Sequence, residues 1–138
     1  MNLAQEMSRH LAQSLHAKTL SRPSRWAEKC RIMPKPFPGP YSFTYHPWCR
    51  EIHDCEAPEV VTRKGAQTGL SESWINVGLH ALDQQKVNVF YVLPTTSPDA
   101  ENFSTARIGK AIELSPYIKN MFTRTLQVGL KSTPTALS

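Results

Sequence analysis

The sequence predicts an α/β fold with a parallel sheet and flanking helices, and three observations lead to this prediction. A short apolar strand, Val60–Thr62, precedes a glycine-containing loop and a helical pattern over residues 70–84. A second apolar strand, Val87–Leu93, precedes another loop and a helix that begins near Ser97. This order of strand, loop and helix, repeated, is typical of parallel α/β units, because parallel strands need long crossover connections.

An amphipathic helix is expected over residues 2–20, ahead of the α/β part. Its stripe either docks on the chain's own core or binds a partner protein. Pro23 then interrupts the helical pattern, so residues 1–24 are treated as one N-terminal unit. The apolar side chains of the stripe recur every four residues, at Leu3, Met7, Leu11 and Leu15.

Residues 25–58 are predicted to form a proline-rich connector and a short helix. Four prolines and a glycine in PKPFPGP, residues 34–40, oppose regular helix and a central strand. A stiff extended segment that wraps the chain's own surface is therefore expected, the alternative being a ligand for an aromatic-lined groove. Pro47 suits the first position of a short helix in PWCREIHD, residues 47–54.

Residues 59–138 contain the strands and helices of the α/β part, which is predicted to be a truncated core. Ser97 suits a helix N-cap, and Pro98 suits the first helical position. A further short turn is expected between Ser115 and Phe122, and only a weak strand signal follows, around residues 125–130. The apolar side of the helix consists of Phe103, Ala106, Ile108, Ile112 and Leu114.

The composition is that of an ordinary globular chain. It has 138 residues, of which 40% are hydrophobic and 20% charged. No apolar run approaches the roughly 20 residues that span a bilayer, so no membrane partner is expected and the predicted location is the cytoplasm. Three cysteines form an odd set without a signal peptide, which favours reduced thiols. The net charge of +5 is compatible with a nucleic-acid partner but is too evenly spread to identify one.

The stretch VVTRKGAQTGLSES, residues 60–73, has the character of a phosphate-binding loop with a displaced lysine. Against the pattern G-x-x-x-x-G-K-[ST], Gly69 and Ser71 match, Leu70 stands at the lysine position and Lys64 at the first glycine. A long side chain at the start of such a loop can reach the same anion from the other side. On spacing alone the signal is weak, because any strand-to-helix turn can contain a glycine and a serine.

Four segments together carry a more specific resemblance. They are PGPYSFTYHP, PWCREIHD, KGAQTGLSES and YVLPTTSPDAENFSTARIGKAI. In this combination the chain resembles the N-terminal part of the large terminase subunit of tailed bacteriophages, of the lambda-like type, over roughly residues 26–122. In that family the phosphate loop is often deviant, with a lysine at its head, as Lys64 is here.

The resemblance implies a partial P-loop NTPase that uses ATP and Mg²⁺. It implies a motor that drives viral DNA into the capsid through the portal of the prohead, in the bacterial host cytoplasm. The complete protein in that family also carries a metal-dependent nuclease and works with a small terminase subunit.

The resemblance also implies roles for single residues of the loop. Lys64 would contact the phosphates, and Ser71 would face the magnesium ion. The segment Tyr45–Arg50 lies where the family tends to contact the adenine. The phosphate cradle and the helix start that follows it comprise Gly65, Ala66, Gln67, Thr68, Gly69 and Leu70.

The sequence departs from the family where catalysis is concerned. No apolar strand ends in an Asp-Glu pair that would hold magnesium, and no carboxylate cluster suits a two-metal nuclease. No catalytic residue is therefore assigned, and we expect weak nucleotide binding with little hydrolysis from this chain alone. The alternative is a non-catalytic interaction module that binds another terminase subunit without nucleotide.

Several other groups of candidate functional residues have simpler structural interpretations. Arg63 is a second candidate phosphate cation if the register slips by one, a DNA-backbone contact, or a solvated strand end. Glu51 and Asp54 are read as a solvated helix face rather than an acid/base pair. Dispersed basic residues such as Lys110 and Lys119 identify no DNA surface. A zinc site is disfavoured for His46, Cys49, His53 and Cys55, and Trp48 and Trp74 are expected in the core, whereas Trp26 is a possible base-stacking residue.

Overall fold

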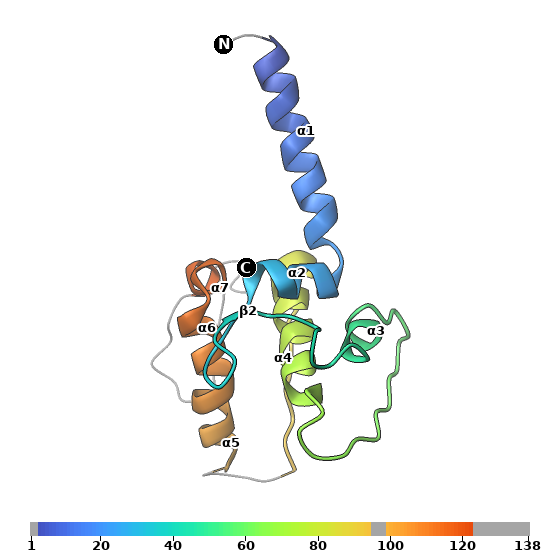
Figure 1. Ribbon diagram of the computed structural model, residues 1–138, viewed down its shortest axis with the longest axis vertical. Coiled ribbons are helices and arrows are strands. Elements are labelled where there is room, and N and C mark those ends of the chain that lie inside the picture. The colour runs from blue at the N-terminus through green and yellow to red at the C-terminus, as the bar shows by residue number, and fades with distance from the viewer. Residues whose placement is uncertain (1–2, 95–98, 123–138) are drawn as a thin grey trace.

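Helices dominate the computed structural model, which describes residues 3–94 and 99–122 (Figure 1). A two-stranded antiparallel hairpin is the one sheet among these residues. The elements are α1 (Leu3–Leu20), α2 (Pro23–Cys30), β1 (Ile32–Met33), β2 (Gly39–Pro40), α3 (Cys49–His53), α4 (Leu70–His80), the π-helical turn η1 (Ala81–Gln85), α5 (Asp99–Phe103), the π-helical turn η2 (Ser104–Gly109), α6 (Lys110–Leu114) and α7 (Pro116–Met121).

Helix α4 is the central element of the folded body. In Figure 1 it runs between α3 on one side and the α5–η2–α6 rod on the other, with α2 lying across its C-terminal end. Ile75 and Leu79 of α4 belong to the hydrophobic core, together with residues from every neighbouring helix. The buried members of that core are Leu20, Trp26, Ala27, Cys30, Tyr41, Phe43, Cys49, Leu70, Ile75, Leu79, Ala111 and Ile118.

Helix α1 projects away from this body, as Figure 1 shows. The helix predicted over residues 2–20 is confirmed, but its stripe does not dock on the chain's own described core. Such a face is normally buried, because exposed apolar area on a helix carries a free-energy cost in water. The four side chains of the stripe are 58% to 71% exposed: Leu3, Met7, Leu11 and Leu15.

Helix α2 was not predicted, and Pro23 begins it rather than only interrupting α1. Proline suits this place because the first helical N–H has no intrahelical partner. The carboxylate of Asp54 caps the same end, accepting hydrogen bonds from the Ser24 backbone N–H at 3.0 Å and from Ser24 Oγ at 2.7 Å. Asp54 therefore belongs to a helix cap and not to a solvated face.

The carboxylate of Asp83 links α7 to α2 through hydrogen bonds. Asp83 Oδ2 accepts a hydrogen bond from Trp26 Nε1 at 2.7 Å and another from the Tyr117 hydroxyl at 2.9 Å. Trp26 is fully buried and its ring meets His80 edge-on. The possible base-stacking tryptophan is thus a core residue. Burial beside the Asp83 carboxylate raises the pKa of Tyr117 above its usual range.

The proline-rich segment forms a hairpin, and not only an extended connector. Ile32 pairs with Pro40, and Met33 pairs with Gly39, on either side of the turn. Gly39 has a φ of 127°, which only glycine adopts readily. One residue beyond this ladder, the Tyr41 N–H donates a hydrogen bond to the Arg31 carbonyl oxygen at 2.9 Å.

The two strands on which the α/β prediction rested do not form in the described residues. Neither Val60–Thr62 nor Val87–Leu93 is paired, and no parallel sheet occurs within residues 3–94 and 99–122. A strand is stable only when a neighbouring strand takes up its backbone N–H and C=O groups, and the described chain places none beside either segment. Val61 and Phe90 are correspondingly exposed.

The other helical predictions are confirmed. Residues 70–84 form α4 and η1, α3 falls inside residues 47–54, and α7 covers most of the turn predicted between Ser115 and Phe122. The helix starting positions Ser97 and Pro98 lie outside the described residues. None of the helices in the described ranges has the length and apolar character that a bilayer crossing requires.

Candidate functional site

The N-terminus of α4 is the place where the loop predicted to bind phosphate ends. Gly69 precedes the helix with φ 77° and ψ −4°, a left-handed conformation that favours glycine. The first intrahelical bond that Gly69 accepts comes from the Ser73 N–H at 3.0 Å. The N–H groups ahead of Ser73 have no intrahelical acceptor, and with the helix dipole they favour an anion at this end.

Space requires glycine at position 69 as well. A Cβ built there would lie 2.8 Å from Cδ2 of His46, closer than real Cβ atoms approach. The His46 ring also meets the ring of Trp48 at 5.3 Å. The segment that includes α3 thus lies directly against the start of α4.

The last residue of the loop before Gly69 is tied down through its carbonyl group. Thr68 O accepts a hydrogen bond from Trp48 Nε1 at 3.1 Å and a weaker one from Cys49 Sγ at 3.5 Å. Gln67 lies just before it in a left-handed conformation, with a φ of 55°. These contacts hold the C-terminal half of the loop in one shape, while Gly65 has open space where a side chain would be.

The loop's cations point to solvent, whereas the residue at the usual lysine position does not. Leu70 is 6% exposed and belongs to the hydrophobic core. Arg63 and Lys64 are both exposed, and Lys64 makes no ion pair with any described residue. Ser71 is half-buried at the helix start. Leu70 therefore packs in the core, and the phosphate-contacting role of Lys64 remains a prediction.

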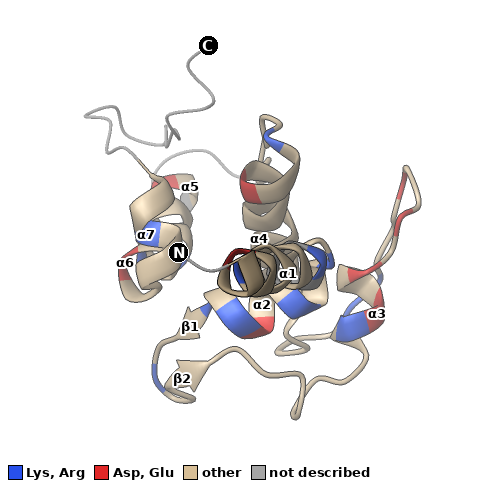
Figure 2. Cartoon of the chain, turned by 90° about the horizontal axis from the view of Figure 1, so that it is seen from above, with Lys and Arg blue, Asp and Glu red and all other residues tan. Residues whose placement is uncertain are grey.

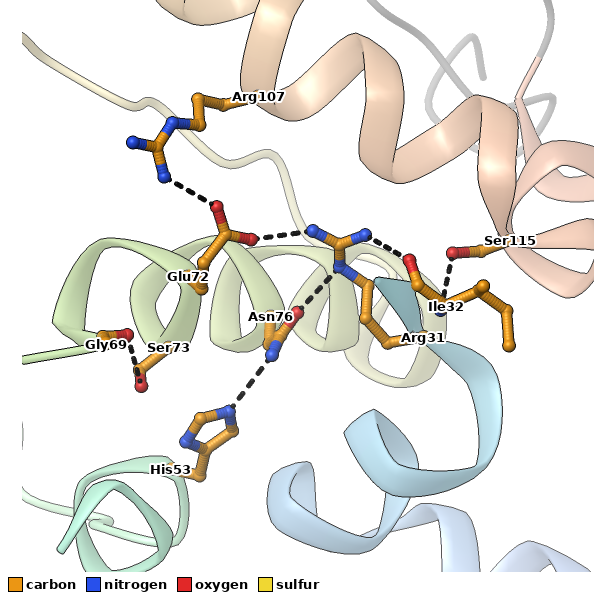
Figure 3. Close-up of polar contacts among 9 residues, drawn as sticks. All are labelled: Arg31, Ile32, His53, Gly69, Glu72, Ser73, Asn76, Arg107 and Ser115. Carbon is orange, nitrogen blue, oxygen red and sulfur yellow. Dashed lines mark hydrogen bonds and ion pairs between the residues drawn. The ribbon is translucent and has the colours of Figure 1, made fainter. Parts of the chain in front are cut away.

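A chain of polar contacts runs along α4 from its first turn (Figure 3). Glu72 Oε2 accepts from Arg31 Nη2 at 2.7 Å, and Glu72 Oε1 accepts from Arg107 Nη1 at 2.9 Å. Arg31 Nε donates to Asn76 Oδ1 at 3.1 Å, and Asn76 Nδ2 lies 3.4 Å from His53 Nε2. Burial lowers the pKa of Arg31, while the Glu72 carboxylate opposes that change.

The same contacts determine the protonation of His53. Its Nδ1 lies 2.8 Å from the Cys49 carbonyl oxygen, which only accepts, so Nδ1 carries the proton. Arg31 holds the Asn76 oxygen on its own side, so the Asn76 amide group donates to His53 Nε2. The ring is therefore neutral, and burial lowers the pKa of His53 in agreement.

The residues for which a zinc site is disfavoured on sequence grounds lie in different surroundings. Cys49 is buried against the loop, His46 packs on Gly69, and Cys55 is exposed. The part of the chain that the structure describes has no group of three His, Cys, Asp or Glu side chains placed to hold a metal ion. Trp48, expected in the core, is 51% exposed.

Apart from the loop, an apolar hollow lies between α4, residues 89–93 and the α5–η2 rod. Its volume is about 630 Å³, and Trp74, Leu82 and Phe103 are among its mostly apolar lining. The half-buried Trp74 thus faces this hollow. Figure 2 shows the Lys and Arg residues of the described chain spread over several elements.

Sequence patterns did not reveal Arg31, Asn76 and Arg107 as neighbours of the site. Arg31 lies 41 residues from Glu72 and 45 from Asn76, so no local spacing connects them. A lone arginine after a helix carries no signal of its own. The packing of α2 against α4 brings Arg31 to Glu72 and Asn76, and Arg107 reaches Glu72 from η2 through an ion pair.

Comparison with known proteins gives one match. The family described as phage terminase large subunit gpA, ATPase domain, matches residues 35–133, which include α3, the loop and α4. No curated protein and no solved structure matches the chain. Because the family match covers well over half of the chain and includes the glycine-ended loop that leads into α4, the chain belongs to the family of gpA-type phage terminase large subunits.

Proposed function

We propose that the chain supplies the phosphate-binding part of a DNA-packaging ATPase and binds Mg²⁺-ATP at the start of α4. The observation that carries this proposal is the combination of a helix N-terminus that follows left-handed Gly69 with the exposed Lys64, which forms no ion pair with any described residue. Fixed backbone N–H groups and a mobile point charge are what a triphosphate requires. The family match supports the same ligand class.

Each loop residue then has a defined task. Lys64 contacts the phosphates, and the backbone from Gly65 through Gly69 forms the cradle. Leu70 contributes its N–H and anchors the helix in the core. Ser71, half-buried at the helix start, provides a hydroxyl ligand for magnesium, which neutralises phosphate charge when bound.

The described residues offer binding groups but no acid that would hold the metal from a second side. In-line hydrolysis needs such an acid and a positioned water. We therefore expect the 138-residue chain to bind nucleotide weakly and to turn it over little or not at all. In a complete ATPase domain, residues 60–62 and 87–93 would join further strands in the parallel sheet of a P-loop fold, where their exposed apolar side chains would be buried.

Viral DNA, the prohead portal and a small terminase subunit are the partners that this function requires, in the bacterial host cytoplasm. The chain's positive charge is modest and dispersed, so it identifies no DNA-binding surface. A DNA-binding measurement tests this partner. Binding of fluorescent ATP analogue is the direct test, with and without magnesium.

The decisive variants are Lys64→Ala and its neighbour Arg63→Ala as the matched control. We expect Lys64→Ala to weaken binding at least tenfold and Arg63→Ala to change it much less. The reverse order would place the cation one residue earlier. Ser71→Ala should lose only the part of the affinity that magnesium adds.

The exposed stripe of α1 favours a second function, as an interaction module that binds another terminase subunit. Four apolar side chains on one face of a projecting helix are typical of a helix that enters an apolar groove. If wild-type protein at high concentration binds no nucleotide while α1 still binds the small subunit, this second function is the correct one.

A further inference from the structure

Glu72 places a negative charge in the first turn of α4, the helix end at which the phosphates are proposed to bind. It lies three residues after Gly69. A carboxylate at this position interacts favourably with the helix dipole, but it repels an anionic ligand at the same end. This helix end therefore carries a group that opposes the ligand class proposed for it.

Two arginines from different elements neutralise this carboxylate. Arg31, at the end of α2, binds one oxygen, and Arg107, in η2, binds the other, so each oxygen has its own guanidinium (Figure 3). Two positive charges against one negative charge leave this trio with a net positive charge. Figure 3 also shows Glu72 and Ser73 on opposite sides of α4, with the carboxylate directed toward the arginines.

The two arginines differ in what else they do. The Arg31 side chain is 1% exposed and also donates to Asn76 and to the Ile32 carbonyl, so it is part of the core. The Arg107 side chain is 54% exposed. Removing Arg107 would leave the buried contacts of Glu72 in place, while one of the carboxylate oxygens would lose its counter-charge.

We propose that Arg107 is a positioning residue for nucleotide binding, which it favours by neutralising Glu72 in the first turn of α4. This inference rests on the proposed function, because it needs an anion at that helix end. It defines the ligand by charge: the effect of Arg107 grows from a nucleoside monophosphate to a triphosphate. A surface ion pair that served stability alone would not have this dependence.

The test compares the affinities of ATP, ADP and AMP analogues for wild type and for Arg107→Gln, at low and high salt. We expect Arg107→Gln to weaken ATP binding roughly three- to tenfold at low salt and AMP binding less, since each added phosphate charge loses the favourable effect of Arg107 beside the Glu72 carboxylate. Lys110→Gln is the matched control: it removes the same charge from an exposed position three residues away and should change little.

Two rescue variants test the neutralising role of Arg107, and the one that also changes Glu72 separates this role from a direct phosphate contact. Arg107→Lys keeps the charge and should restore most of the affinity. Glu72→Gln in the Arg107→Gln background should restore it as well, because the repelling charge is gone. If that double variant does not fold, Arg107→Lys alone decides, and its failure to restore binding overturns the inference.

The possible outcomes separate a failure of the proposed nucleotide binding from a failure of the role proposed for Arg107. Absence of nucleotide binding by wild type would contradict the proposed function. Wild-type binding that Arg107→Gln and Lys110→Gln leave equally unchanged would contradict only the role of Arg107. A loss in Arg107→Gln that a folded Glu72→Gln double variant does not reverse would also overturn it, since the arginine would then act on the phosphate itself.

Discussion

The imidazole ring of His46 lies against Gly69, so close that a Cβ at position 69 would be 2.8 Å from His46 Cδ2. This contact joins the segment before α3 to the loop end that starts α4. It makes glycine necessary at position 69 for two independent reasons, the left-handed φ of 77° and the lack of space.

Gly69→Ala should therefore destabilise the protein, by about 2 to 4 kcal/mol. Roughly 1 to 2 kcal/mol comes from the left-handed backbone and the rest from displacing the His46 ring. Gly65→Ala is the matched control, because nothing lies within 4 Å of a Cβ there. Its stability should stay within about 1 kcal/mol of wild type. Urea denaturation of both variants measures the difference, and equal midpoints would show that the loop adopts another conformation.

Arg31→Met should cost much more stability than Arg107→Gln. Arg31 is buried and its removal leaves Glu72 and Asn76 without their shared partner, which we expect to cost about 3 to 5 kcal/mol. Arg107 is half-exposed, and exposed ion pairs contribute less than about 1 kcal/mol. Thermal or chemical denaturation measures both. A large loss in Arg107→Gln would mean that its ion pair with Glu72 is mainly structural.

Stability should fall as the pH drops below about 6.5, the ordinary pKa of an unfolded histidine. Burial lowers the pKa of folded His53, so the unfolded state binds the proton first. The stabilisation is complete above the unfolded pKa and is lost as the pH falls toward the folded pKa, by at most about 1.4 kcal/mol per pH unit.

The control for this pH dependence is His53→Gln, which has no titrating ring at that position. The unfolding free energy of wild type and variant is measured between pH 5 and pH 8. The variant is expected to be less stable at pH 8 and to have the shallower slope. Parallel curves would show that another group, and not His53, titrates.

Leu11→Glu should leave the stability of the folded body unchanged, whereas Leu20→Glu should unfold it or nearly so. Both residues lie on α1, but Leu11 is 64% exposed and Leu20 is 4% exposed in the core. Placing a carboxylate in an apolar core costs several kcal/mol unless it is paired. Thermal denaturation tests this directly. A strong loss in Leu11→Glu would show that the α1 stripe is covered by another part of the protein or by a second copy.

Local patterns predicted the helices well because their signals lie within a few residues. The four-residue stripe predicted α1, and the apolar spacing after Leu70 predicted α4 with η1. The prediction for Pro23 was incomplete, because the same residue both interrupts one helix and begins the next. The capping carboxylate, Asp54, lies 30 residues away in the sequence.

The strand predictions failed for a different reason. Val60–Thr62 and Val87–Leu93 have strand-like composition, but a strand depends on a partner strand, which the described residues do not provide. Composition alone therefore identified segments that are able to form strands, but it did not show whether a partner strand is present.

The sequence by itself determined where α1, α3, α4 and α7 form, the glycine-ended loop and the family resemblance, because each depends on residues close together in the chain. The tertiary structure alone decided that Leu70 packs in the core while Lys64 is exposed, and that Arg31 and Arg107 meet at Glu72. These facts depend on which helices pack together. Packing is a property of whole helix surfaces meeting in space, and no local spacing encodes it.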